Sequence, residues 1–196
     1  MPAPPTKIMF IRHGEKPSKQ PDKHGLWDVQ ENGQSGGGLS LIVRGWHRAG
    51  GLPSFFAPYQ STPTNPAIAT PDYIYAASPD AESQRPWETV TPLAAWLKYE
   101  QNTPQFNTGF KINGGEADMV ASVLSLSGTV LVCWEHDNIM PNIMNAIHTS
   151  VPIVNYDAIP AAWPGVFYLV WVLDLNGGSS YTWSSHNQNL LAGDVT

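Results

Sequence analysis

Charged side chains are scarce in this sequence. Asp, Glu, Lys and Arg make up 13% of its 196 residues, about half the share of an average soluble protein. Ten basic residues stand against sixteen acidic ones, so the formal net charge is -6. Because nucleic-acid binding requires clustered Lys and Arg side chains, this balance excludes a broad surface for DNA or RNA.

Cysteine and long apolar runs are equally scarce. The single cysteine, Cys133, cannot form an internal disulfide, and its apolar neighbours predict an inert, buried thiol. The first apolar run covers only 8–11, which is too short for a signal peptide or a membrane span. We therefore expect a cytoplasmic protein with no membrane partner, while its oligomeric state stays open.

The remaining composition favours one globular domain. Apolar residues form 42% of the chain, and its length suits a single domain over 1–196. Apolar strands alternate with helical segments; the strands are expected at 7–11, 73–77, 110–112 and 129–134, and the helices at 40–55, 83–99, 116–126 and 138–148. This alternation predicts a three-layer α/β/α sandwich around a mostly parallel central sheet.

Three local features refine this expected fold. Asn176-Gly177-Gly178 separates two stretches, 166–175 and 181–185, and predicts a C-terminal antiparallel hairpin at one edge of the sheet. Ser40 is a suitable N-cap for the first helix. Pro92 falls inside the second helix, where it is expected to kink or shorten that helix.

Side chains capable of phosphate chemistry follow the apolar strands. They come from three segments that are far apart in the sequence, namely Arg12 with His13, Arg85, and His136 with Asp137. Because the carboxyl ends of parallel strands open onto one crevice, these side chains are expected to converge. Two guanidinium groups and two imidazole rings in one crevice suit a phosphate group.

Several motifs surround these residues. They are Arg12-His13-Gly14-Glu15, Leu39-Ser40 with Arg44-Gly45-Trp46-His47-Arg48-Ala49, Ser78-Pro79 with Arg85, Glu88 and Thr89, Val130-Leu131-Val132-Cys133-Trp134-Glu135-His136, and the tail at 189–194. With these motifs in this order, the sequence resembles the histidine phosphatase superfamily, which has the phosphoglycerate-mutase-like fold. The short stretch between Arg85 and Glu116 leaves no room for a cap domain, so the chain is similar to the small, capless phosphatases of that superfamily.

The resemblance implies a role for each residue at the strand ends. His13 would be the nucleophile that takes up the phosphoryl group as a phosphohistidine, which water then hydrolyses. Arg12, Arg85 and His136 would hold the phosphate oxygens and stabilise the charge of the transition state. Glu15 is counted among the substrate contacts, and the scheme requires no metal or other cofactor.

The proton donor for the leaving group is the least defined part of the site. Relatives of the mutase type carry a glutamate after the second arginine, but the stretch 101–114 contains no carboxylate. In the acid-phosphatase branch the donor is the aspartate directly after the second histidine, which favours Asp137. An acidic residue at a helix start is equally often a capping charge, so Glu15, Glu82 and Glu135 remain alternative donors.

Other polar and aromatic residues receive simpler interpretations. Arg44 and Arg48 are placed on a solvated helix face. Lys16 is interpreted as a surface lysine, with an additional phosphate contact as the alternative. Trp27 and Trp163 fall in expected loops and are candidates for the lip of a substrate pocket, whereas most other tryptophans are expected in the core.

Three functions agree with these residues. The first is a metal-independent phosphomonoesterase that acts on a small phosphorylated molecule through His13. The second is a phosphoprotein or phosphohistidine phosphatase, since a site without a cap admits a bulky partner. The third is a phosphate-binding regulatory module without turnover, which the undefined proton donor would explain. The glycine-rich loop at 16–38 is expected to border the pocket, although it identifies no ligand.

Overall fold

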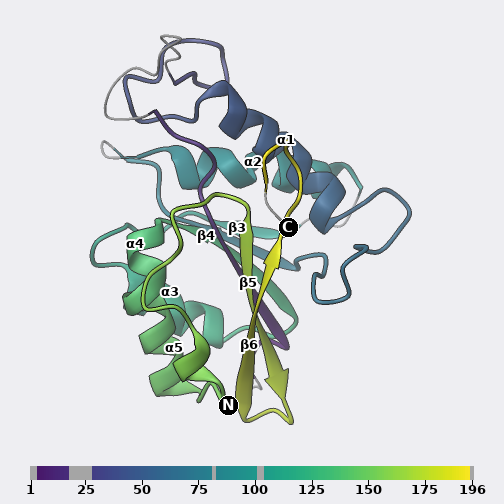
Figure 1. Cartoon of the computed structure of the whole chain (residues 1–196), viewed down its shortest axis with the longest axis vertical. Helices are drawn as coiled ribbons and strands as arrows, with labels where there is room; N and C mark the ends of the chain where they lie inside the picture. Colours follow the sequence, from purple (N-terminus) through teal and green to yellow (C-terminus); the bar gives the residue numbers. More distant parts are fainter. Residues whose placement is uncertain (1–3, 18–27, 81–82, 101–103, 195–196) are drawn as a thin grey trace.

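A computed structural model of the chain describes residues 4–17, 28–80, 83–100 and 104–194 (Figure 1). Its strands are β1 (Lys7–Arg12), β2 (Tyr73–Ala76), β3 (Gln105–Asn107), β4 (Thr129–Trp134), β5 (Leu169–Asn176) and β6 (Ser180–Asn187). Its helices are α1 (Val43–Phe56), α2 (Arg85–Tyr99), α3 (Glu116–Leu124), α4 (His136–Asn138) and α5 (Met144–Ser150). The described strands form one sheet in the order β3-β2-β4-β1-β5-β6.

The sheet is parallel except at one edge. β1 pairs in parallel with β4, with Lys7 opposite Thr129, and pairs on its other side with the antiparallel β5. β5 and β6 form a hairpin, and β6 is the outer strand. The mostly parallel sheet with an antiparallel hairpin at its edge is therefore confirmed, as is the strand predicted at 129–134.

Helices cover both faces of the sheet and give it three layers (Figure 1). Successive side chains of a strand point to opposite faces, so β1 contributes to two cores. Ile8 and Phe10 lie in one core with buried residues of α3 and α5. Met9 and Ile11 lie in the other core with α1 and α2. The predicted three-layer architecture is confirmed. No helix in the described ranges has the length and apolar character to cross a membrane.

The third strand does not lie where the sequence predicts it. The structure has β3 beside β2, whereas the predicted segment 110–112 forms no strand. β3 is short, and its only apolar residue is Phe106. Its place in the sheet depends on backbone pairing with β2, which an apolar pattern does not reveal.

The start of α1 also differs from the expectation. The helix begins at Val43 after the extended Ile42, and Ser40 does not cap it. The backbone N–H of Leu41 instead donates to the carboxylate of Glu88 at 2.9 Å. This bond gives the N–H a partner outside the helix and keeps the chain extended before α1.

Proline affects the later helices in two ways. α2 runs unbroken through Pro92, because the burial of Leu93 and Leu97 against the sheet offsets the hydrogen bond that proline cannot make. The last predicted helix is divided into α4, a π-type turn and α5. The division falls where Met140 is extended before Pro141, since proline disfavours the helical conformation of the residue before it.

Trp163 belongs to the core rather than to a substrate lip. The residue is 4% exposed, and its ring centre lies 4.5 Å from that of Trp171. The expectation for Trp163 is therefore wrong, because its loop folds back onto the sheet. Trp27 lies outside the described residues.

Candidate active site

The loop after β1 is tied to two other segments by hydrogen bonds. The backbone N–H of His13 donates to the carbonyl of Trp134, at the end of β4, over 3.3 Å. The N–H of Gly14 donates to the hydroxyl of Thr89 in α2 over 2.8 Å. These bonds bring the ends of β1 and β4 together with the N-terminal half of α2.

Two glycines let this loop pack directly on α1. A Cβ atom at Gly45 would lie 2.5 Å from the carbonyl oxygen of Glu15, a distance that real Cβ atoms essentially never show. A Cβ atom at Gly14 would lie 3.1 Å from the carbonyl oxygen of Gly45. The close approach explains the glycine in both motifs and fixes the loop against the helix.

His13 is buried, and the backbone determines which ring nitrogen carries the proton. The residue is 2% exposed, and its Nδ1 lies 2.7 Å from the carbonyl oxygen of Gly14. Because a carbonyl oxygen only accepts, Nδ1 carries the proton and Nε2 of the neutral ring keeps its lone pair. Burial lowers the pKa of His13 well below 6.5, and Arg12 and Arg85 lower it further, so the ring is neutral at neutral pH.

Arg12 lies against an aromatic ring that the sequence analysis missed. Its guanidinium carbon is 4.0 Å from the centre of the Phe167 ring, and its Nη1 is 3.4 Å from the carbonyl oxygen of Val166. The ring of Phe167 also lies 6.0 Å from that of His13. Burial lowers the pKa of Arg12 to about 10, which leaves it charged at neutral pH. Phe167 follows no motif, so only the folded chain shows its position.

Arg85 opens α2 and points its guanidinium toward a neighbouring loop. Its Nη1 donates to the carbonyl of Gly38 over 2.7 Å. Burial lowers the pKa of Arg85, and the carboxylates of Glu135, Asp28 and Glu88 partly offset that shift. The guanidinium therefore lies between this loop and the ends of the strands.

His136 and Asp137 open α4 directly after β4. The rings of His13 and His136 lie 6.5 Å apart in an edge-to-face arrangement. Nε2 of His136 lies 3.3 Å from Oδ1 of Asp137, whose side chain is 75% exposed. Burial and Arg12 lower the pKa of His136, while Asp137 raises it. Asp137 thus lies beside the second histidine at the solvent edge of the site.

Arg12, His13, Arg85 and His136 converge as predicted, and we refer to them as the basic cluster. Three of its buried nitrogens have no partner among the described residues, namely Nε of Arg12, Nε of Arg85 and Nδ1 of His136. Within the described ranges, neither guanidinium forms an ion pair. Buried N–H groups without a partner are unfavourable, so the basic cluster suits an anion that accepts hydrogen bonds.

Lys16 extends the positive charge of the basic cluster. Burial lowers the pKa of its ammonium group, and Arg85 and Arg12 lower it further. Like charges have this effect only at short range, so the ammonium group of Lys16 lies near both guanidinium groups. The position agrees with the alternative of an additional phosphate contact.

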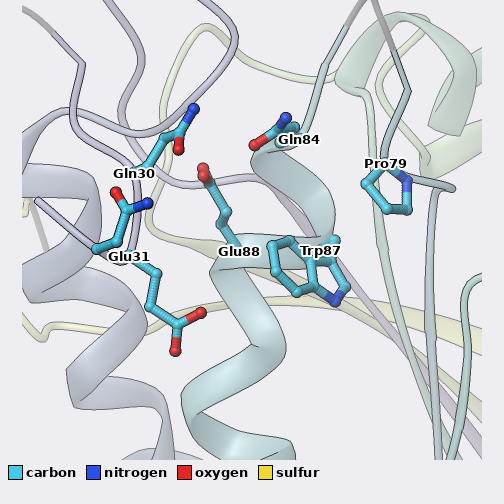
Figure 2. Close-up of a pocket in the computed structure, with 7 residues that line it drawn as sticks. Gln30, Glu31, Pro79, Gln84, Trp87 and Glu88 are labelled. Carbon is cyan, nitrogen blue, oxygen red and sulfur yellow. The ribbon is translucent and has the colours of Figure 1, made fainter. Parts of the chain in front are cut away.

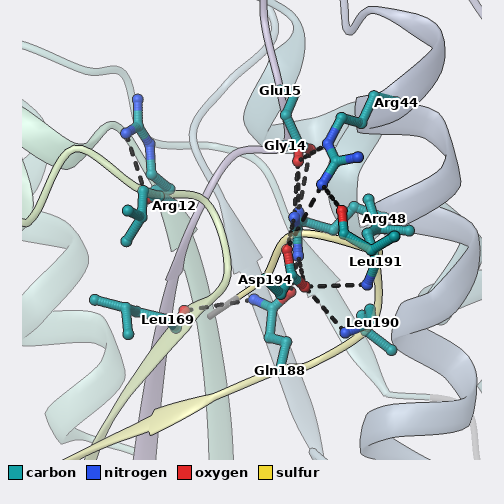
Figure 3. A network of polar contacts seen from close by, with 12 residues as sticks. Arg12, Gly14, Glu15, Arg44, Arg48, Leu169, Gln188, Leu190, Leu191 and Asp194 are labelled. Carbon is teal, nitrogen blue, oxygen red and sulfur yellow. Dashed lines mark hydrogen bonds and ion pairs between the residues drawn. The ribbon is translucent and has the colours of Figure 1, made fainter. Parts of the chain in front are cut away.

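Glu15 points into a separate ion network with the C-terminal segment (Figure 3). Its Oε1 lies 2.7 Å from Nη2 of Arg48 and 3.2 Å from Nε of Arg44. Nη2 of Arg48 also lies 2.8 Å from Oδ1 of Asp194, and Nη1 of Arg48 donates to Gln188 over 3.2 Å. Because two arginines occupy its carboxylate, the geometry argues against Glu15 as a substrate contact or proton donor.

The expectation that Arg48 lies on a solvated face is wrong. Arg48 is 1% exposed, whereas the side chain of Arg44 is 45% exposed. The buried residues of α1 are Gly45, Arg48, Ala49, Leu52 and Phe56. Their helical spacing places Arg48 on the inner face, and only its charge suggested otherwise.

The remaining candidate proton donors differ in their surroundings. Although burial lowers the pKa of Arg12 and Arg85, Glu135 partly offsets both shifts, so it lies near them. Its Oε2 accepts a hydrogen bond from Asn138 at 3.1 Å. Glu82 lies outside the described residues. Of the candidate donors that the structure describes, Asp137 and Glu135 border the basic cluster without being held by Arg44 and Arg48 as Glu15 is.

The cysteine and two of the other histidines have partners or surroundings of their own. Cys133 is fully buried in β4, and burial raises the pKa of its thiol. His148 accepts a hydrogen bond from the N–H of Ile153 at 3.0 Å, and His186 is paired with Ser184 at 2.9 Å. Among the described residues, no three His, Cys, Asp or Glu side chains group in a way that could hold a metal ion.

Known proteins offer few matches to this chain. No protein-family model matches it, and no curated protein matches it in sequence. Among solved structures, it is similar to one assigned as the phosphohistidine phosphatase SixA from Agrobacterium tumefaciens, with 14% identity and a TM-score of 0.48, covering 93% of this chain and 97% of that one. A similarity of this size defines neither the family nor the activity of the chain.

Proposed function

We propose that the chain is a phosphatase that transfers the phosphoryl group of a phosphate monoester to His13 and then to water. The observation that carries the proposal is the set of unpartnered buried nitrogens on Arg12, Arg85 and His136, grouped around the ring of His13. Guanidinium and imidazole N–H groups donate well to the oxygens of a tetrahedral dianion. The motifs that resemble the histidine phosphatases contain the same residues.

Each step of the proposed reaction uses one part of the basic cluster. Nε2 of His13 supplies the electron pair for a new N–P bond while the P–O bond to the organic group breaks. Arg12 and Arg85 stabilise the charge on the phosphoryl oxygens in the transition state. Water then attacks phosphorus, the N–P bond breaks with its electron pair returning to Nε2, and phosphate leaves. The bond from Nδ1–H to Gly14 keeps the ring oriented throughout.

Asp137 is the proposed donor of the proton that the leaving oxygen takes up. It lies beside His136 at the solvent edge, where a leaving group departs. The carboxylate of Glu15 is occupied by arginines, and that of Glu88 accepts from the backbone of Leu41. The carboxylate of Asp137 then takes a proton from the water that attacks phosphorus, so the donor is restored.

Hydrolysis of p-nitrophenyl phosphate tests the proposed function. Wild-type protein is expected to release phosphate between about pH 4 and pH 8, and a His13→Ala protein is not. An acid-labile, alkali-stable phosphoryl adduct should appear transiently on the wild type. If wild type releases no more phosphate than His13→Ala, the proposed esterase activity is wrong. An adduct that forms without turnover would favour the regulatory module.

Replacing Asp137 with asparagine should have an effect that depends on the leaving group. An alkoxide needs a proton to leave, whereas p-nitrophenolate leaves readily without one. We therefore expect Asp137→Asn to slow an alkyl phosphate far more than p-nitrophenyl phosphate, as measured by kcat/KM. Glu135→Gln provides the matched control. Equal slowing of both substrates by Asp137→Asn would remove Asp137 from the donor role, and selective slowing by Glu135→Gln would assign the role to Glu135.

The acid limb of the pH profile of kcat/KM should have its midpoint at a pH lower than 6.5. Burial lowers the pKa of His13, so its ring stays neutral and nucleophilic at pH values where an ordinary histidine is protonated. The rate should therefore rise with pH through this lowered pKa and be fully developed by pH 6.5. The profile of kcat/KM reports this pKa, and NMR titration of His13 and His136 shows which ring is responsible. A His13 midpoint at or above 6.5 would contradict the expectation.

A further inference from the structure

A cavity of about 510 Å³, open to solvent, lies beside the first turns of α2 (Figure 2). Gln84, Trp87 and Glu88 line it from the start of the helix, and Gln30 and Glu31 line it from the facing loop. This volume is typical of a site for a small organic molecule. The basic cluster described above is not part of its lining.

The cavity lies next to the basic cluster on the surface of the same helix. Successive helical residues are turned by about 100°, so Gln84, Trp87 and Glu88 share one face while Arg85 and Thr89 share the next. The second face holds the loop after β1 through the hydroxyl of Thr89. A ligand whose phosphate lies on Arg85 is therefore one helical step away from the cavity.

The facing loop connects the two sites directly. The guanidinium of Arg85 donates to the carbonyl of Gly38 over 2.7 Å. The N–H of Gln84 donates to the carbonyl of Leu39 over 3.0 Å. The loop that supplies Gln30 and Glu31 to the cavity is thus bonded both to Gln84, on the helix face toward the cavity, and to Arg85, on the face toward the basic cluster. Gln84, the chain neighbour of Arg85, is part of the lining of the cavity.

The charge of the cavity is opposite to that of the basic cluster. Glu31 and Glu88 contribute carboxylates, and no described Lys, Arg or His lines the cavity. Burial raises the pKa of Glu88, and hydrogen bonds from Ser40 and Leu41 and the charge of Arg85 partly offset that shift. The exposed Glu31 is therefore the carboxylate that the cation of a ligand reaches. Trp87 adds an aromatic ring, and such rings attract ammonium groups. The carboxamides of Gln30 and Gln84 supply further acceptors for N–H groups.

We propose that this cavity binds the organic part of the substrate and selects one that carries an ammonium group. The preferred substrate is then a phosphate monoester of an amino alcohol, with its phosphate on the basic cluster and its cation beside Glu31 and the ring of Trp87. This inference rests on the proposed function for the position of the phosphate. The carboxylates of the cavity repel a second anionic group, so bisphosphates and phosphorylated acids are disfavoured.

Binding of matched ligands tests the inference without requiring turnover. A series of ω-aminoalkyl phosphates is compared with n-alkyl phosphates of the same chain length, using calorimetry on the His13→Ala protein. The ligands of each pair differ in charge but hardly in size. At the best chain length we expect the aminoalkyl phosphate to bind about tenfold more tightly. A ratio of Kd values near one at every length would overturn the inference.

A variant of Glu31 tests whether the charge of the cavity, rather than that of the rest of the protein, causes the preference for aminoalkyl phosphates. Glu31→Gln should reduce the aminoalkyl preference, because it removes a negative charge from the lining without changing its shape. The matched control is Glu100→Gln at the other end of α2, which should leave the preference unchanged. A preference that survives Glu31→Gln in full would also overturn the inference. Failure of the proposed function is distinguishable, because it appears only as an absence of p-nitrophenyl phosphate hydrolysis by the wild type.

Discussion

Replacing Arg48 with leucine is expected to lower the free energy of unfolding by about 3–5 kcal/mol. The guanidinium lies between the carboxylates of Glu15 and Asp194, and the side chains of both Arg48 and Asp194 are 2% exposed. Leucine leaves these two carboxylates buried without their main counter-charge. Such uncompensated charges are among the most destabilising changes a single substitution produces. Denaturation in urea, followed by tryptophan fluorescence, measures the loss.

Arg44 provides the matched control for this prediction. It lies one turn before Arg48 on α1 and contacts the same carboxylate of Glu15, but its side chain is 45% exposed. Exposed ion pairs contribute little, so Arg44→Leu should lower stability by less than about 1 kcal/mol. Equal losses in the two variants would show that burial of Arg48 is not the cause.

The same network makes stability depend on pH. Burial alone would raise the pKa of Asp194, but hydrogen bonds from Arg48 hold it below its ordinary value of 3.8. Because the folded state then binds fewer protons than the unfolded state at low pH, this contribution is present above pH 3.8 and is lost as the pH falls below it. The Arg48→Leu protein should lose the part of that acid dependence that comes from Arg48, while the N–H groups of Leu190 and Leu191 still bind Asp194.

Replacing Arg85 with methionine is expected to lower kcat/KM for p-nitrophenyl phosphate by about 10²–10³-fold. Methionine removes the guanidinium whose Nε is buried and unpartnered among the described residues, so a bound phosphoryl group loses charge stabilisation in the transition state. Arg85→Lys should recover only part of the activity, since an ammonium group lacks the planar pair of donors. Steady-state kinetics of the three proteins give the comparison.

The control for Arg85 lies at the other end of the same helix. Lys98 is an exposed residue in the last turn of α2, and Lys98→Met should change neither kcat nor KM. Thermal unfolding of each variant checks that Arg85→Met remains folded. A folded Arg85→Met protein with less than a threefold loss of kcat/KM would contradict a phosphate-binding role for this arginine.

Sequence patterns identified the elements that bury apolar side chains on both faces. β1 and β4 are continuous apolar runs because they are covered by helices on both sides, and their bounds follow from that property. β3 was missed because its position depends on backbone pairing with β2. Patterns of apolar residues contain no information about such a pairing.

For the candidate site, too, sequence patterns predicted some residues and missed others. Arg12, His13, Arg85 and His136 could be brought together because parallel strands present their carboxyl ends at one edge. The helical spacing of α1 indicated a buried Arg48, but its counter-charge Asp194 and the ring of Phe167 on Arg12 were not predicted, since each lies more than a hundred positions from its partner. A charged or aromatic side chain gives no sign of such a partner in its own local sequence.

The pairing of β1 with β4 has a consequence for the kinetics of folding. Lys7 lies opposite Thr129, so the two strands that the histidines follow meet only after the loop that contains α1, α2 and α3 has closed. Contacts of such high sequence separation form slowly in a refolding chain. Recovery of the proposed phosphatase activity after dilution from denaturant should therefore lag behind recovery of helical circular dichroism, and the lag would report the closure of this central strand pair.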